Sequence, residues 1–169
     1  MVNAYRRLLF PVGVLLAATL ASPHVHADAA AAEALFREGK KLMAAGDTAA
    51  ACDKFAESQR LDASSGTLLN LADCHVKQGK TASAWAEFLA AARLARGKGE
   101  SGRADEAQKR ASALEGALSS LSIKVTEQVP GLEIKRDDVV LQQGSLSAKI
   151  PVDPGQHVIS AAAPGYKAW

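Results

Sequence analysis

The stretch "ALFREGKKLMAAGDTAAACDKFAESQRLD" (residues 34–62) decides the fold, because "TLLNLADCHVKQGKTASAWAEFLAAARLA" (67–95) repeats its pattern at a constant offset of 33 residues. Apolar and small residues recur in both stretches at spacings of three and four, which is the period of an α-helix. One glycine interrupts each pattern at the same position, Gly46 and Gly79, where the left-handed residue that ends a helix is expected. Each stretch therefore predicts two helices joined by a short turn.

The matched positions also predict how these helices pack. Small residues let two helices approach closely, and the phenylalanines fill the space between them. Asp47 and Thr81 are the expected N-caps of the second helices. A further helical pattern from Arg103 to Leu118 predicts a fifth helix that caps the stack, after a glycine-rich flexible junction at 93–102. The matched pairs are Leu35 and Leu68, Gly39 and Ala72, Leu42 and His75, Ala51 and Ala84, Phe55 and Phe88, Ser58 and Ala91, and Leu61 and Leu94.

This pattern resembles the tetratricopeptide repeat (TPR). The residues "KQG" at 77–79 are typical of that family, whereas His75 stands where a tyrosine or leucine is usual and Ala63 where a proline is usual. The period is also one residue shorter than in the family. The resemblance implies an α-solenoid with two repeats in residues 28–96, followed by a linker and capping helix in 97–120.

Beyond residue 120 the apolar period changes from helical to two, which indicates strands. Short strands separated by proline, glycine and aspartate turns predict a small β-sandwich over residues 121–169, and the whole chain is therefore expected to be α+β. The expected strands are "LSIKV" (121–125), "LEIKR" (132–136), "LSAKIPV" (146–152) and "HVISAAA" (157–163), with turns at Pro130-Gly131, Asp137-Asp138, Asp153-Pro154-Gly155 and Pro164-Gly165.

The segment "VDPGQHVISAAAPGY" (152–166) resembles a PEGA domain, a small extracytoplasmic β-module. A complete module of this kind continues with at least one more strand. The resemblance therefore implies either that the module is truncated at Trp169 or that something else covers an exposed sheet edge.

Residues 1–27 have the pattern of an export signal. Arg6 and Arg7 precede an apolar run at 8–20, and "VHA" at 25–27 forms a small-x-small cleavage site. The apolar run is shorter than the roughly 20 residues of a comfortable membrane span, so a cleaved signal is favoured over the alternative of an uncleaved anchor. We expect an exported chain with no transmembrane segment in its mature part.

Composition argues against several classes of function. The signal carries two of the 20 basic residues and none of the 18 acidic ones, so the mature chain is close to neutral. It lacks the basic patch that nucleic-acid binding requires. It also contains no nucleophile–base pair, carboxylate pair, phosphate loop or zinc-ligand spacing. We therefore expect no catalytic residue, no metal and no cofactor.

Cys74 and His75 are adjacent, and neighbouring residues on a helix point about 100° apart, so they do not form one catalytic or metal-binding pair. Cys52 and Cys74 instead fall on inward positions of two helices that are neighbours in a repeat stack. An exported chain permits a disulfide between them, and the alternative is two buried thiols that act as small apolar residues. His75 is expected to be a packed residue with a hydrogen bond.

The concave surface of repeat stacks is formed mainly by the first helix of each unit, and it commonly binds extended peptides. Asparagine and lysine side chains on it suit a peptide backbone or a carboxylate, and the alternative is an ordinary solvated surface. The six polar residues that the pattern places there are Arg37, Lys40, Lys41, Asn70, Asp73 and Lys77.

An export signal followed by TPR-like repeats and a PEGA-like module is similar to envelope TPR–PEGA proteins of myxobacterial and other δ-proteobacterial lineages. The resemblance implies a non-catalytic scaffold that binds a protein or peptide in the periplasm or cell envelope of a Gram-negative bacterium. The alternative is an adaptor that binds cell-wall polysaccharide through the β module, where Tyr166 and Trp169 are the candidate aromatic residues.

Overall fold

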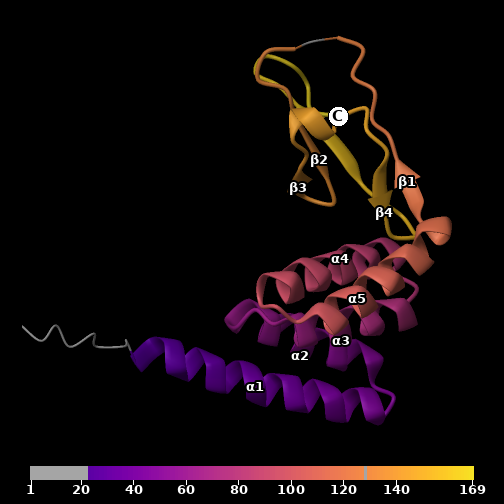
Figure 1. Cartoon of the computed structure of the whole chain (residues 1–169). Coiled ribbons are helices and arrows are strands. Elements are labelled where there is room, and N and C mark those ends of the chain that lie inside the picture. Colours follow the sequence, from indigo (N-terminus) through magenta and orange to yellow (C-terminus); the bar gives the residue numbers. More distant parts are fainter. Residues whose placement is uncertain (1–22, 128) are drawn as a thin grey trace, which may run out of the picture.

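The computed structural model describes residues 23–127 and 129–169 and has the expected α+β class. Five helices form the helical part (residues 23–118), and two small antiparallel sheets form the β part (119–169). The β part stands beside α4 and the end of α5, whereas α1 lies on the far side of the stack (Figure 1). The helices are α1 (Pro23–Ala44), α2 (Thr48–Leu61), α3 (Ser65–Lys77), α4 (Thr81–Gly97) and α5 (Ser101–Leu114), followed by a 3₁₀ turn at Glu115–Ala117.

Each helix packs against the next one along the chain, which gives the expected series of helical hairpins. Gly46 and Gly79 end α1 and α3 with φ of 85° and 74°, a region that glycine enters without steric cost. Gly39 allows α1 and α2 to approach closely, because a Cβ atom there would lie 2.7 Å from the Cε1 atom of Phe55. The repeat pattern therefore predicted both the turns and the close contact between the first two helices.

Two details of the helical prediction are wrong. The expected flexible junction at 93–102 is mostly helix, because α4 continues to Gly97 and α5 begins at Ser101. Alanine-rich helices extend easily, and three of the alanines in α4, Ala91, Ala92 and Ala95, are fully buried. Thr81 is the first residue of α4 rather than its cap, whereas the cap prediction at Asp47 is confirmed by a bond from the Ala50 N–H to the Asp47 carboxylate at 3.2 Å.

The apolar core runs along the stack. Phe55 lies at its first level, between α1, α2 and α3, and Phe88 occupies the equivalent position between α3, α4 and α5. Both phenylalanines are almost completely buried. The capping helix contributes Ala104, Ala107 and Ala111, as the sequence predicted.

The β part consists of a two-stranded sheet, β1–β4, and a three-stranded sheet in the order β3–β2–β5. The strands are β1 (Ser119–Leu121), β2 (Glu133–Arg136), β3 (Val139–Val140), β4 (Ile150–Val152) and β5 (Ile159–Ala162), and a 3₁₀ turn occupies Gln143–Ser145. The Asp137-Asp138 turn is confirmed: both residues have positive φ, 51° and 67°, as a two-residue hairpin turn between β2 and β3 requires.

The predicted strand at 121–125 is wrong in position, since β1 ends at Leu121. Burial still alternates beyond it, with Ile123 and Val125 half-buried and Lys124 exposed. The stretch has no continuous partner, however, because β4 spans only Ile150–Val152 and pairs with Ser119–Leu121. The hydrophobic period was therefore read correctly, but pairing decides where a strand ends.

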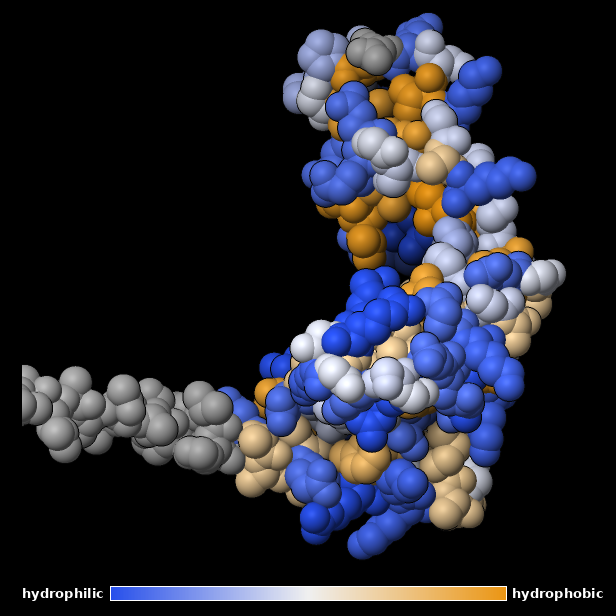
Figure 2. All heavy atoms as spheres, viewed as in Figure 1, coloured by the Kyte–Doolittle hydropathy of each residue, from blue (hydrophilic) through white to orange (hydrophobic). Residues whose placement is uncertain are grey.

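Trp169 adds a residue of sheet at the edge of β5. Its backbone N–H and C=O exchange two hydrogen bonds of 3.0 Å with Ala161. Its side chain is exposed, as is that of Tyr166. Figure 2 shows hydrophobic residues gathered on the visible face of the β part, whereas the helical part presents a largely hydrophilic surface.

The predicted export signal lies mostly outside the described residues, and the predicted cleavage site at Ala27 falls inside α1. Among the described residues, no helix combines the length and the apolar character that crossing a membrane requires.

Candidate functional site

We define the first-helix face as the six predicted residues on α1 and α3, namely Arg37, Lys40, Lys41, Asn70, Asp73 and Lys77. The repeat offset relates four of them, because Arg37 corresponds to Asn70 and Lys40 to Asp73. Arg37 donates a hydrogen bond to Glu33 on its own helix at 2.6 Å. Lys40 and Lys77 are exposed, and neither forms an ion pair within the described part of the chain.

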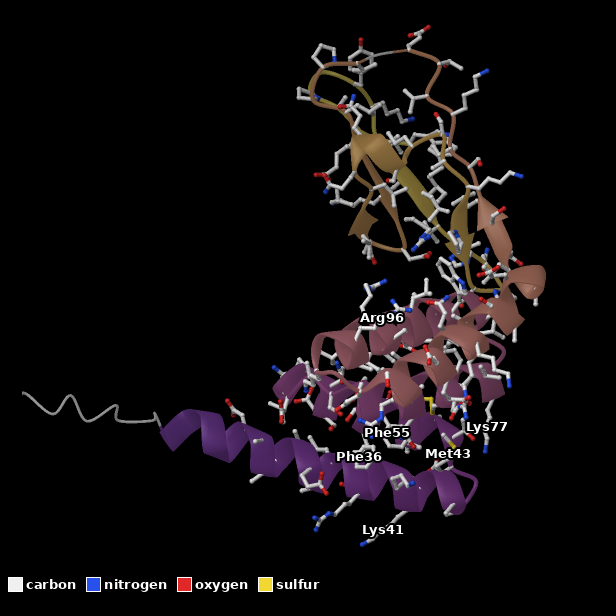
Figure 3. All side chains as sticks on the ribbon, viewed as in Figure 1. Phe36, Lys41, Met43, Phe55, Lys77 and Arg96 are labelled. Atoms are coloured by element: carbon white, nitrogen blue, oxygen red, sulfur yellow. A yellow bond between two sulfur atoms is a disulfide. The ribbon has the colours of Figure 1, made fainter. Side chains whose placement is uncertain are left out.

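Lys41 lies on a different surface from the other five residues. Its equivalent in the second repeat is Cys74, which is completely buried at the junction between the repeats. Among the described elements no helix precedes α1, so Lys41 is exposed to solvent at the position that Cys74 occupies in α3. Figure 3 shows Lys41 pointing away from α2, on the outer side of α1. Lys41 therefore lies on the polar end surface of the stack, as is usual for a terminal repeat.

Asn70 and Asp73 are already engaged in contacts within the protein. The Asn70 side-chain amide donates to the Gly66 carbonyl at 2.8 Å. The Asp73 carboxylate accepts two bonds from one Arg110 nitrogen, at 2.6 and 2.8 Å, so it ties α3 to α5. The positively charged groups left for a partner are thus Lys40 and Lys77, with Arg37 shared with Glu33.

Arg110 is a surface residue that the sequence analysis missed. It also donates to Glu106 at 2.7 Å, and its guanidinium lies 5.7 Å from the centre of the Phe88 ring. The hydrogen bond from Arg110 lowers the pKa of Glu106. The spacing of four residues between Glu106 and Arg110 was visible in the sequence, but the contact with Asp73 depends on how α5 packs.

The junction between the repeats contains the disulfide Cys52–Cys74, which joins α2 to α3 with a Cα–Cα distance of 5.6 Å. Both cysteines are buried. The prediction of a bridge is confirmed over its alternative of two free thiols.

His75 turns away from the disulfide and toward α4, where its Nδ1 atom lies 2.8 Å from Glu87 Oε2. Its side chain is 17% exposed, so the histidine is packed and hydrogen-bonded as predicted. Within residues 23–127 and 129–169, no three histidine, cysteine, aspartate or glutamate side chains are grouped as they would be around a metal ion.

A polar contact joins the helical part to the β part. Asp153, in the loop after β4, accepts bonds from the Ser83 backbone N–H at 2.9 Å and from the Ser83 hydroxyl at 2.6 Å. Ser83 lies in the first turn of α4, whose N-terminal N–H groups have no partner within the helix, and the cap residue Lys80 supplies no side-chain bond. A carboxylate from the β part therefore caps α4 in place of a local residue.

The electrostatics of this contact follow from its hydrogen bonds. Partial burial would raise the pKa of Asp153, but the bonds from Ser83 and from the Ala82 N–H outweigh burial, so the pKa is lowered. A cavity of ≈ 390 Å³ lies beside it, lined by Trp85, Arg136 and Pro151 among others. The sequence placed Asp153 only in a turn, and nothing local to it indicated a helix 70 residues earlier.

Comparison of the chain with protein-family models, with curated proteins and with solved structures gave no match.

Proposed function

We propose that this chain is a non-catalytic protein-binding or scaffold protein of the cell envelope, related to TPR proteins in its helical part and to PEGA modules in its β part. The observation that carries the proposal is the stacking of two equivalent helical hairpins, which repeats the same surface positions side by side. Such stacks present a continuous surface to an extended peptide.

The residues that contact the partner are Arg37, Lys40, Asn70 and Lys77. Lys40 and Lys77 supply exposed ammonium groups for carboxylates, and Asn70 suits a peptide backbone. Asp73 has a different role in this proposal, because its bonds with Arg110 fix α5 against α3 and so set the shape of the surface. Two repeats offer a short surface, which favours a modest affinity.

A disulfide and a sequence pattern support the proposed location. The disulfide Cys52–Cys74 is a type of bond that persists in oxidising compartments such as the periplasm. The basic start and apolar run at 1–27 are the matching sequence feature.

Charge reversal tests the binding surface. The double variant Lys40→Glu/Lys77→Glu should lose the partner, because each substitution replaces an attraction for carboxylates by a repulsion. The loss should be about tenfold or more in affinity, which corresponds to about 1.4 kcal/mol. The measurement is quantitative mass spectrometry of proteins retained from an envelope extract by immobilised wild-type and variant chains.

The matched control is Arg93→Glu, which reverses an exposed charge on α4, a second helix of a repeat. It should retain the same proteins as the wild type. Equal retention by all three chains would show that binding does not use the first-helix face.

The alternative function, binding of cell-wall polysaccharide, is favoured by the exposure of Tyr166 (66%) and Trp169 (79%) on the β part. Co-sedimentation of the whole chain with purified peptidoglycan distinguishes the two. Our proposal expects no co-sedimentation. Sedimentation that Tyr166→Ala/Trp169→Ala abolishes would favour the polysaccharide adaptor instead.

A further inference from the structure

A histidine lies beside the contact between the two parts of the molecule. Asp153 caps α4 through its carboxylate, and the same residue's backbone carbonyl lies 2.7 Å from Nε2 of His157. The other ring nitrogen, Nδ1, lies 2.6 Å from the Asp137 carboxylate. We define Ser83, Asp137, Asp153 and His157 as the latch.

Both partners of His157 are hydrogen-bond acceptors only. A carbonyl oxygen has no proton to give, and neither has the ionised carboxylate of Asp137. A neutral imidazole carries one N–H, so it satisfies only one of these partners and points a lone pair at the other. The imidazolium ion carries two N–H groups and satisfies both. The geometry of His157 is therefore that of the protonated form.

Asp137 is itself held firmly in place. Its second carboxylate oxygen accepts the Val158 backbone N–H at 3.0 Å, and its own N–H donates to the Val158 carbonyl at 2.9 Å. The histidine thus ties the 153–157 loop, which carries the cap of α4, to the end of the three-stranded sheet.

The other charged groups around the latch are few. Arg136 lies on the β2 side, with its Nε atom 3.7 Å from Asp137, and its positive charge opposes protonation of His157. On the α3 side His75 acts on Asp153 and is paired with Glu87 of α4. The first turn of α4 contributes Ser83, which is uncharged. The two latch aspartates therefore outnumber the nearby arginine.

We propose that the latch is a pH-sensitive connection: protonated His157 holds the β part on the N-terminus of α4, and loss of that proton releases the loop and loosens the two parts. Loss of the His157 proton removes one hydrogen bond of the loop, and Asp153 can then separate from Ser83. The relative placement of the helical part and the β part then varies with pH near neutrality.

The direction of the pKa shift of His157 agrees with this proposal. The Asp153 carbonyl, and after it the Asp137 carboxylate, raise the pKa of His157 above its ordinary value of 6.5. A raised pKa means that the latch is fully stabilised below about pH 6.5 and loses that stabilisation as the pH rises through the higher value. The lowered pKa values of Asp137 and Asp153 keep both carboxylates ionised throughout this range.

The Ser83 backbone amide reports directly on the latch. As one of the first N–H groups of α4 it has no acceptor within the helix, and its partner is Asp153. We expect its hydrogen-exchange protection in the full chain, measured by NMR and corrected for the intrinsic effect of pH, to fall from about pH 5 to about pH 8. For each unit by which the pKa of His157 is higher in the closed latch than in the open one, the protection of Ser83 should fall about tenfold.

Two variants make the test specific. His157→Gln should remove the pH dependence of Ser83 protection, whereas His75→Gln, at the other packed histidine, should leave it in place. Constant Ser83 protection in the wild type across this range would overturn the proposal, and so would an unchanged pH dependence in His157→Gln. Because the first outcome needs no variant, the test stands even if a substitution prevents folding.

Discussion

Phe55→Ala should lower the free energy of unfolding by about 3–5 kcal/mol, the range for truncating a fully buried phenylalanine. The ring is completely buried among Ala51, Leu71 and the disulfide, and its centre lies 5.7 Å from that of Phe36. Figure 3 shows Phe36 of α1 facing Phe55 of α2. Gly39 of α1 lies against the same ring, so the cavity that Phe55→Ala leaves closes only if α1 or α2 shifts. Urea denaturation monitored by circular dichroism measures the loss.

The repeat supplies a matched comparison. Phe88 fills the equivalent position and is 2% exposed, so Phe88→Ala should lose a similar amount. Phe36→Ala should lose less, because Phe36 is only half-buried. A loss below about 1 kcal/mol for Phe55→Ala would mean that the two repeats do not share the packing described here.

Breaking the disulfide should have the second largest effect. The bridge closes a loop of 22 residues, and constraining the unfolded chain over such a loop contributes about 3 kcal/mol. Cys52→Ala/Cys74→Ala should therefore unfold at a lower urea concentration, by an amount equivalent to about this free energy. Reduction of the wild-type protein should produce a similar change.

Each single alanine variant should lose nearly as much as the double variant, since either one abolishes the bridge. Additive losses from the two single variants would indicate two independent buried side chains instead. Thiol titration of the unfolded, unreduced protein offers a direct control, and finding two reactive thiols would contradict the bridge.

The sequence predicted the helical part well because its information is local and repeated. A glycine at the same place in each repeat sets a turn, and phenylalanine beside small residues sets the helix contact. The disulfide followed from the register, since Cys52 and Cys74 occupy facing positions only if the repeats stack. Thr81 failed as a cap for the opposite reason: the group that caps α4 comes from Asp153, far along the chain.

The β part was predicted less precisely because strand boundaries depend on partners. Alternation in "LSIKV" continues beyond Leu121, which pairs with Ile150, the first residue of the antiparallel strand β4, so pattern alone placed the strand too late. The short strand β3 was missed, although the turn before it was recognised. Pairing of Val139 with Arg136 completes a hairpin that two apolar residues cannot indicate by themselves.

The candidate site shows the same difference between features that local sequence sets and features that distant contacts set. Four residues of the first-helix face match one another in the repeat register, Arg37 with Asn70 and Lys40 with Asp73, and the sequence pattern placed them there. Lys41 was grouped with them because helix spacing alone does not say which surface lies at the end of a stack. Arg110, Asp153 and His157 matter through contacts over long sequence distances, and no local pattern marks them.

The central claim is that the first-helix face binds a protein partner in the envelope. Site-specific photo-crosslinking tests it most directly, with a benzophenone amino acid placed at Lys40 or Lys77 and, as the control, at Arg93. We predict protein adducts in intact cells from Lys40 and Lys77 and none from Arg93. Adducts from Arg93 alone, or no protein adduct from either position on the face, would contradict the claim.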